Sequence, residues 1–242
     1  MKSLPFLLDQ SDELSIWRAE TFWTKEPETL AWLDYWEAFA SEQSITFVDV
    51  GANIGIYTLY ASSLKSFQTV FAIEPMPNTF KPLKKNVELN DFRNIVAINL
   101  PALSSQKKVK FIYNDTRVGS TGGSLFEKPT YANVGEELNT RTITGDSVLE
   151  NSPNQSIIKI DVDGADFEVL KGFQDSIKKQ KIISVLIEAD AHTEFDVRHF
   201  LKNNDYEEDQ KFVNHSSHSS KRRQLVGSSV KNIIFTRSDF LQ

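Results

Sequence analysis

One short segment passes from the pattern of a buried strand to that of a helix across two glycines. Residues Ile45 to Val50 are mostly β-branched or apolar, which predicts a strand buried on both faces. Apolar residues at helical spacing begin at Ile54. Gly51 permits a sharp turn and a close approach to a ligand, and Gly55 permits tight packing of the helix against the sheet. Because the first N–H groups of a helix have no partner within it, we expect a ligand at the end of this strand.

Strand and helix patterns alternate after this loop. Strands are expected at 45–50, 69–74, 95–99, 157–162 and 182–188, and helices at about 54–64, 78–90, 165–172 and 193–203. Such alternation predicts an α/β, Rossmann-like fold with a parallel sheet, helices on both faces and right-handed crossovers. Two more strand patterns, at about 206–213 and 231–236, have no helix between them. They should pair as a C-terminal antiparallel hairpin that completes a mostly parallel seven-stranded sheet.

The N-terminal segment and two loops lie outside this alternation. Pro27 suits the first turn of a helix over about 27–41, which carries an aromatic stripe of Trp32, Tyr35, Trp36 and Phe39. We predict a helical N-terminal extension, residues 1–44, packed on an α/β domain of residues 45–242; a substrate or dimer surface is the alternative role of the stripe. A further strand is expected at 107–113, a lid-like loop at 114–140 and a second loop at 214–229.

Composition narrows the function. The absence of cysteine excludes disulfides, thiol catalysis and zinc sites built on cysteine. The net charge of -6 argues against broad binding to nucleic acid or anionic membranes. The apolar segment Leu4 to Leu8 is too short for a secretory signal, and no run approaches the roughly 20 apolar residues of a membrane span. We therefore expect a cytoplasmic protein with a small-molecule partner.

Carboxylates end four of the expected strands: Asp49, Glu74, Asp161 and Glu188. Ligands of parallel sheets bind at these ends, and Glu74, which is 23 positions after Gly51 (74 - 51), suits the ribose hydroxyls of an adenosine. Acids would repel the pyrophosphate of a dinucleotide but attract the sulfonium and ammonium groups of S-adenosylmethionine. The loop also lacks the third glycine of the dinucleotide fingerprint. The pattern therefore favours S-adenosylmethionine over NAD.

Three blocks carry a family resemblance: Val48 to Thr58, Ala72 to Asn78, and Ile158 to Gly172. They resemble the motifs of class I S-adenosylmethionine-dependent methyltransferases of the FkbM type. The resemblance covers residues of about 45 to 205. The chain departs from the group's pattern at three positions: Asp163 and Asp166 stand where glutamates are usual, and Gly145 stands where a leucine is usual.

The resemblance implies methyl transfer from S-adenosylmethionine to an oxygen of a small-molecule or carbohydrate acceptor. The residues implied to bind the cofactor are Asp49, Gly51, Ala52, Asn53, Gly55, Tyr57, Glu74, Pro75, Asn78, Leu103, Ser104 and Asp161. Structural roles are the alternatives at three places. Asp49 could cap the following turn, Asn53 could be a helix N-cap, and Asp163 with Gly164 could form a turn.

An alcohol acceptor must lose its proton to a base within hydrogen-bond reach. The candidates are Asp161, Asp163, Glu188 and His192, and our hypothesis is that Asp161 or Glu188 is the catalytic base, because both end strands. Two rivals to the methyltransferase are an NAD-dependent oxidoreductase and a non-catalytic S-adenosylmethionine-binding module.

The C-terminal loop contains two weaker signals. His215 and His218 lie in a serine-rich segment without a third ligand, so we expect no metal site there. The basic run Lys221 to Arg223 could attract a phosphate or carboxylate of the acceptor, although a solvated charged loop is the alternative. The sequence leaves the oligomeric state open, with a homodimer as one alternative.

Overall fold

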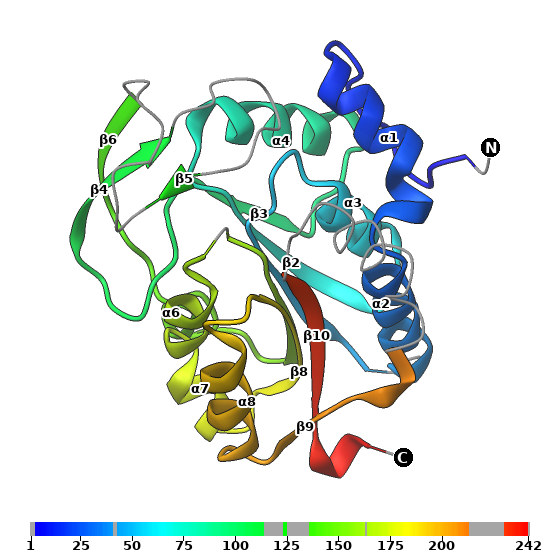
Figure 1. The fold of residues 1–242 in the computed structure, drawn as a ribbon. Coiled ribbons are helices and arrows are strands. Elements are labelled where there is room, and N and C mark those ends of the chain that lie inside the picture. Colours follow the sequence, from blue (N-terminus) through cyan, green and yellow to red (C-terminus); the bar gives the residue numbers. More distant parts are fainter. Residues whose placement is uncertain are drawn as a thin grey trace.

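A seven-stranded sheet forms the centre of the fold (Figure 1), in the order β3-β2-β1-β7-β8-β10-β9. The computed structural model describes residues 3–40, 43–113, 123–124, 136–162, 164–212 and 230–241. The strands are β1 (Ile45–Val50), β2 (Phe67–Ile73), β3 (Ile95–Ile98), β7 (Gln155–Ile160), β8 (Ile182–Ala189), β9 (Tyr206–Glu208) and β10 (Lys231–Arg237). The first five pair in parallel, and β10 lies antiparallel between β8 and β9. The predicted sheet with its C-terminal antiparallel hairpin is confirmed.

Helices cover both faces of this sheet. One face packs on α1 (Glu13–Lys25), α2 (Pro27–Phe39) and α3 (Ile56–Ser63), and the other on α5 (Gly145–Val148), α6 (Asp166–Lys171), α7 (Gln174–Lys178) and α8 (Glu194–Lys202). A hydrophobic core lies on each face of the sheet, because successive side chains of a strand point to opposite faces. In β1, Phe47 packs in the core on the first face, and Val48 and Val50 pack in the core on the second. The remaining helix, α4 (Pro77–Leu89), packs through Leu83 near the loop after β1.

The N-terminal helices lie on the face that also carries α3. The sequence predicted α2 but not α1, whose N-cap is Asp12; its carboxylate accepts from the backbone N–H groups of Leu14 and Ser15, each at 3.0 Å. Trp32 and Trp36 of the aromatic stripe are fully buried, and the Trp32 Nε1 donates to Ser184 Oγ of β8 at 2.9 Å. This part of the stripe therefore packs on the sheet.

A second, three-stranded antiparallel sheet contains β4 (Lys108–Tyr113), β5 (Gly123–Ser124) and β6 (Glu136–Arg141), in the order β5-β4-β6. It confirms the strand expected at 107–113. The expected loop 114–140 is wrong at residues 123–124 and 136–140, which are strand; its other residues lie outside the described ranges, as does the loop 214–229. The short helices α5 and α7 were not predicted, and β9 is shorter than expected. Within the described ranges, no helix combines the length and the apolar character that a membrane crossing requires.

Candidate functional site

The loop after β1 is held against β7 at a distance that only glycine permits. Gly51 has φ +82°, and a Cβ at this position would lie 1.9 Å from the carbonyl oxygen of Asp161. The N–H groups of Gly51 and Ala52 both donate to the carbonyl of Ile73, at 2.9 and 3.0 Å, which fixes the loop to β2 as well. The ends of β1, β2 and β7 therefore meet at this loop.

Gly55, with φ +89°, is the N-cap residue of α3. A Cβ at Gly55 would lie 3.3 Å from the side chain of Leu83, so its tightest contact is with α4 rather than with the sheet. The alternative role of Asn53 as an N-cap is wrong. Asn53 has φ +53°, and its side-chain oxygen accepts from the N–H of the next residue, Ile54.

Glu74 follows β2 and bridges two loops. Its Oε2 accepts from the N–H of Asn53 at 3.0 Å, and its Oε1 accepts from the N–H of Met76 at 2.8 Å. The residue is only 5% exposed. Burial raises the pKa of Glu74 to about 7, against the effect of the two N–H donors. Glu74, which the sequence predicts to bind the ribose hydroxyls, therefore lies against the glycine loop.

Asp49 is buried beneath this loop. Its Oδ2 accepts from the hydroxyl of Thr58 on α3 at 2.6 Å, which ties β1 to α3. Its other oxygen, Oδ1, is also buried and accepts no hydrogen bond from the described residues. Burial raises the pKa of Asp49, while Lys159 and Thr58 oppose that rise. A buried carboxylate oxygen of this kind suits an N–H donor of a ligand.

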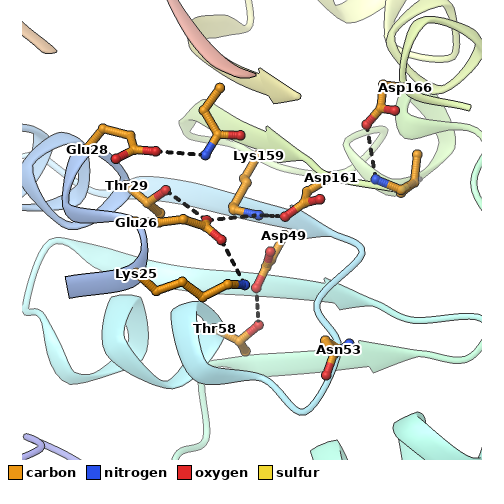
Figure 2. Close-up of polar contacts among 12 residues, drawn as sticks. Lys25, Glu26, Glu28, Thr29, Asp49, Asn53, Thr58, Lys159, Asp161 and Asp166 are labelled. Carbon is orange, nitrogen blue, oxygen red and sulfur yellow. Dashed lines mark hydrogen bonds and ion pairs between the residues drawn. The ribbon is translucent and has the colours of Figure 1, made fainter. Parts of the chain in front are cut away.

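Lys159 lies at the centre of a buried charge network that we missed from the sequence (Figure 2). Its Nζ is 2.7 Å from Asp161 Oδ2 and 3.9 Å from Glu26 Oε2. The side chains of Lys159 and Glu26 are each 1% exposed. Burial opposes the charge of Lys159, but Asp161, Glu26 and Asp49 raise its pKa above the ordinary value. The sequence did contain one signal of this network, a lysine inside an otherwise apolar strand. No feature of the sequence around Glu26, at the junction of α1 and α2, indicates that it would be buried beside Lys159.

The two candidate bases stand on neighbouring strands. Asp161 follows β7, its side chain is 28% exposed, and its N–H donates to the carbonyl of Val50 at 3.1 Å. Glu188 lies in β8, next to its last residue. The last registered pair of these parallel strands is Ile160 with Ile187, so Asp161 and Glu188 follow as neighbours at the same level of the sheet. The structure thus brings both carboxylates to one edge.

Tyr57 lies within this network, because Lys159 Nζ is 5.2 Å from the centroid of its ring, and the other predicted residues lie around it. Leu103 is buried, and the Ser104 Oγ donates to Glu168 of α6 at 2.9 Å. Of the remaining cofactor candidates, Tyr57 is buried in α3, Pro75 is half-buried, and Asn78 is exposed in the first turn of α4. His192 is exposed in a turn, where its N–H donates to Asp190.

Two of the three departures from the family pattern, Asp166 and Gly145, have local explanations. Asp166 closes the loop after β7, since its carboxylate accepts from the N–H groups of Val162 at 3.0 Å and Gly164 at 3.1 Å. Burial raises the pKa of Asp166 to about 7. At Gly145 a Cβ would lie 2.3 Å from the ring of Phe173, so the aromatic ring fills the space of a side chain. Asp163, His215, His218 and the run 221–223 lie outside the described residues.

A family model described as a methyltransferase FkbM domain matches residues 49–210. The chain belongs to this family. The family resemblance of the three sequence blocks is therefore confirmed for the FkbM domain.

Relatives of this FkbM domain include the hexuronic acid methyltransferase AglP of Haloferax volcanii, 30% identical over 156 residues, which cover 62% of this chain and 58% of that protein. Methyltransferase sdnD of Sordaria araneosa is 26% identical over 155 residues, 53% of this chain and 60% of that protein. The matches thus span about three fifths of the length of these relatives. A solved structure, human methyltransferase 10 domain containing protein, aligns over 88% of this chain and 82% of that chain at 13% identity, with a TM-score of 0.48.

Proposed function

We propose that the FkbM domain transfers a methyl group from S-adenosylmethionine to a hydroxyl of a small-molecule or carbohydrate acceptor. The observation that carries the proposal is the carboxylate arrangement around the Gly51 loop. Asp49 presents a buried oxygen that accepts no hydrogen bond from the described residues, and Glu74 stands at the end of the adjacent strand. A ligand with an ammonium group and a ribose satisfies both.

The charge of the site supports the same ligand. At the strand ends, the three carboxylates of Asp49, Glu74 and Asp161 outnumber the two buried cations beside them among the described residues, Lys159 and Arg18. Negative charge in a site shielded from water attracts a cationic ligand and repels a pyrophosphate. This argument favours the methyl donor over NAD.

Individual residues take separate roles in the proposal. Each oxygen of Glu74 already accepts one backbone N–H, and a carboxylate offers about four acceptor sites, so two remain for the ribose hydroxyls. Asp49 holds the ammonium, Asp161 faces either the ammonium or the acceptor, and Gly51 and Gly55 allow the backbone to approach. The segment of Leu103 and Ser104 flanks the adenine, and Ala52, Asn53, Tyr57, Pro75 and Asn78 line the remaining ligand surface.

When bound, S-adenosylmethionine supplies a methyl carbon activated by a sulfonium. The domain contributes position and a base. Asp161 and Glu188 lie on neighbouring strands at the ligand edge, where either carboxylate accepts the proton of the acceptor hydroxyl. Lys159 fixes the Asp161 carboxylate through a 2.7 Å contact, and holding the acceptor in line with the methyl group accounts for much of the rate.

A carbohydrate acceptor is supported by the relative that is named a hexuronic acid methyltransferase. The net charge of -6 supports a small acceptor over a nucleic acid. A homodimer stays a prediction, and the mass of the purified protein in solution decides it.

The direct test is a thermal-shift titration with S-adenosylhomocysteine and with NAD. A ligand at about 100 times its Kd stabilises a protein by about 2.7 kcal/mol, which raises Tm measurably. We expect stabilisation by S-adenosylhomocysteine alone; stabilisation by NAD alone would support an oxidoreductase instead.

Activity is then measured as S-adenosylhomocysteine release from S-adenosylmethionine over a panel of uronic acids, neutral sugars and other alcohols. Release with at least one hydroxyl acceptor supports the enzyme. Tight binding without release on the whole panel supports the non-catalytic module.

A further inference from the structure

Arg18 is a buried cation on the N-terminal helix α1, next to the candidate site. It lies on the buried face of α1 with Ser15 and Phe22, and it is only 6% exposed. Phe22, one turn farther along this face, packs on Tyr57 and Tyr60 of α3 with ring centroids 6.1 and 5.4 Å apart. Figure 1 shows α1 next to α3, the helix that begins directly after the glycine loop. This face of α1 therefore covers the start of α3.

The surroundings of Arg18 are anionic. Its guanidinium interacts electrostatically with the carboxylates of Glu26, Asp161 and Glu74, and with the hydroxyl of Tyr57. Burial lowers the pKa of Arg18, and these neighbours oppose the shift. An arginine stays protonated in proteins, so the side chain contributes a fixed positive charge to the electrostatics of Asp161 and Glu74. The geometry agrees, because the ring of Tyr57, on which this face of α1 packs, has Lys159 Nζ 5.2 Å from its centroid, and Lys159 contacts Asp161.

The proposed methyl donor needs such a charge. Its methionine end carries an ammonium, which Asp49 and Asp161 suit, and a carboxylate, which these acids repel. Two cationic side chains among the described residues are buried beside these strand ends, Lys159 and Arg18. Lys159 is held at 2.7 Å from Asp161 and is 1% exposed. Arg18, whose planar fork matches a carboxylate, interacts with both Glu74 and Asp161.

We propose that Arg18 binds the carboxylate of a ligand in this site, a role that rests on the proposed function. The carboxylate belongs either to the methionine end of the methyl donor or to an acidic acceptor such as a uronate. Both have the same chemistry, and different experiments separate them.

The first experiment compares two cofactor fragments by calorimetry. S-Adenosylhomocysteine carries the amino-acid group, whereas 5′-methylthioadenosine keeps the adenosine and the thioether without it. Arg18→Met should weaken S-adenosylhomocysteine by about tenfold to a hundredfold, because hydrogen bonds to charged groups contribute about 1.5–3 kcal/mol. Its affinity for 5′-methylthioadenosine should stay within about twofold of wild type. Arg18→Lys keeps the charge, so its affinity for S-adenosylhomocysteine should fall less than that of Arg18→Met.

The second experiment measures KM for a uronic acid acceptor and for the matching neutral sugar. If Arg18→Met leaves both cofactor fragments unaffected but raises KM for the uronate alone, the carboxylate is that of the acceptor. Arg93→Met removes an exposed arginine and serves as the matched control.

The role of Arg18 is overturned if wild type and Arg18→Met bind both fragments with equal affinity and have the same KM for both acceptors. An equal loss for the two fragments also overturns it, because that result indicates general damage. If Arg18→Met does not fold, the same affinity ratio in Arg18→Lys and Arg18→Gln decides. Wild-type binding of S-adenosylhomocysteine tests the proposed function separately, since only the ratio reports on Arg18.

Discussion

Replacing Lys159 by methionine tests the buried charge network directly. At an effective dielectric constant of about 20, its attraction to Asp161 at 2.7 Å is about 6 kcal/mol and that to Glu26 at 3.9 Å about 4 kcal/mol. The cost of burying the charges cancels much of this gain. Removing one partner of a buried pair costs about 3–5 kcal/mol, because Asp161 loses the cation that it contacts, although Glu26 keeps its pair with Lys25 at 3.1 Å. We expect Lys159→Met to lower the free energy of unfolding by that amount.

The assay is urea unfolding at pH 7, with the slope checked so that midpoint shifts report stability. The matched control is Lys171→Met. Lys171 also pairs with an acid, Glu168, but the two side chains are 35% and 38% exposed. Exposed pairs contribute at most about 1 kcal/mol, so the control should change little.

A double variant separates charge from packing. Asp161→Asn removes the carboxylate that Lys159 contacts at 2.7 Å, whereas Glu26 also pairs with Lys25 at 3.1 Å. In the Lys159→Met background Asp161→Asn should recover about 1–2 kcal/mol, a coupling within the range found for contacting charges. Two results would refute the network as a stabilising element. One is a loss of unfolding free energy in Lys159→Met that is no larger than the loss in Lys171→Met; the other is no recovery of stability in the double variant.

Three further sets of variants test the glycine loop, the proposed ribose-binding residue Glu74 and the proposed base. Gly51→Ala should lower the free energy of unfolding in urea by more than about 2 kcal/mol, because its Cβ would lie 1.9 Å from a carbonyl oxygen. Gly164→Ala is the control: Gly164 has φ +94° but no atom within 4 Å of an added Cβ, so the variant should lose only about 1 kcal/mol through backbone strain. The raised pKa of Glu74, about 7 against 4.5, means that its contribution to stability is present below pH 4.5 and is lost as the pH rises to 7. Glu74→Gln removes this pH dependence but leaves one of the two backbone N–H groups without an acceptor, which costs about 1–3 kcal/mol at every pH. Its stability relative to wild type should therefore rise by about 3 kcal/mol between pH 4.5 and 7, and it should bind S-adenosylhomocysteine weakly; equal pH profiles would contradict this. At least one of Asp161→Asn and Glu188→Gln should lower kcat about a hundredfold with the true acceptor, and full turnover in both would exclude the assigned base.

Local pattern was sufficient for much of the fold. The strand Ile45–Val50 was predicted to the residue, and the helix and strand boundaries around it lie within three residues of those expected. Continuous apolar runs, proline at a first helical turn and glycine at a loop are signals of a few neighbouring residues. The placement of Glu74 against the Gly51 loop also followed, because parallel strands end at one edge.

Contacts between distant segments could not be predicted in this way. Lys159 and Asp161 stand in one of the three sequence blocks, but the second partner of Lys159, Glu26, follows α1. That helix was missed because its buried face carries Ser15 and Arg18 together with Phe22. Gly145 was an unexplained departure until the ring of Phe173 was found to fill the space. In both cases the sequence shows one member of a pair, and tertiary packing chooses the other.

The family match begins at residue 49, yet part of the charge at the candidate site comes from earlier residues. Glu26 neutralises Lys159 from the junction of α1 and α2, and Glu28 of α2 accepts from Asn232 Nδ2 at 3.0 Å, on the β10 position that pairs with Glu188. Arg18 adds the cation beside Glu74. In the proposed function the strand ends hold the methyl donor, while the N-terminal helices contribute to the charge around them. Acceptor choice should therefore follow α1 and α2 when these helices are exchanged between FkbM domains, and methyl-donor affinity should follow the strands together with Arg18.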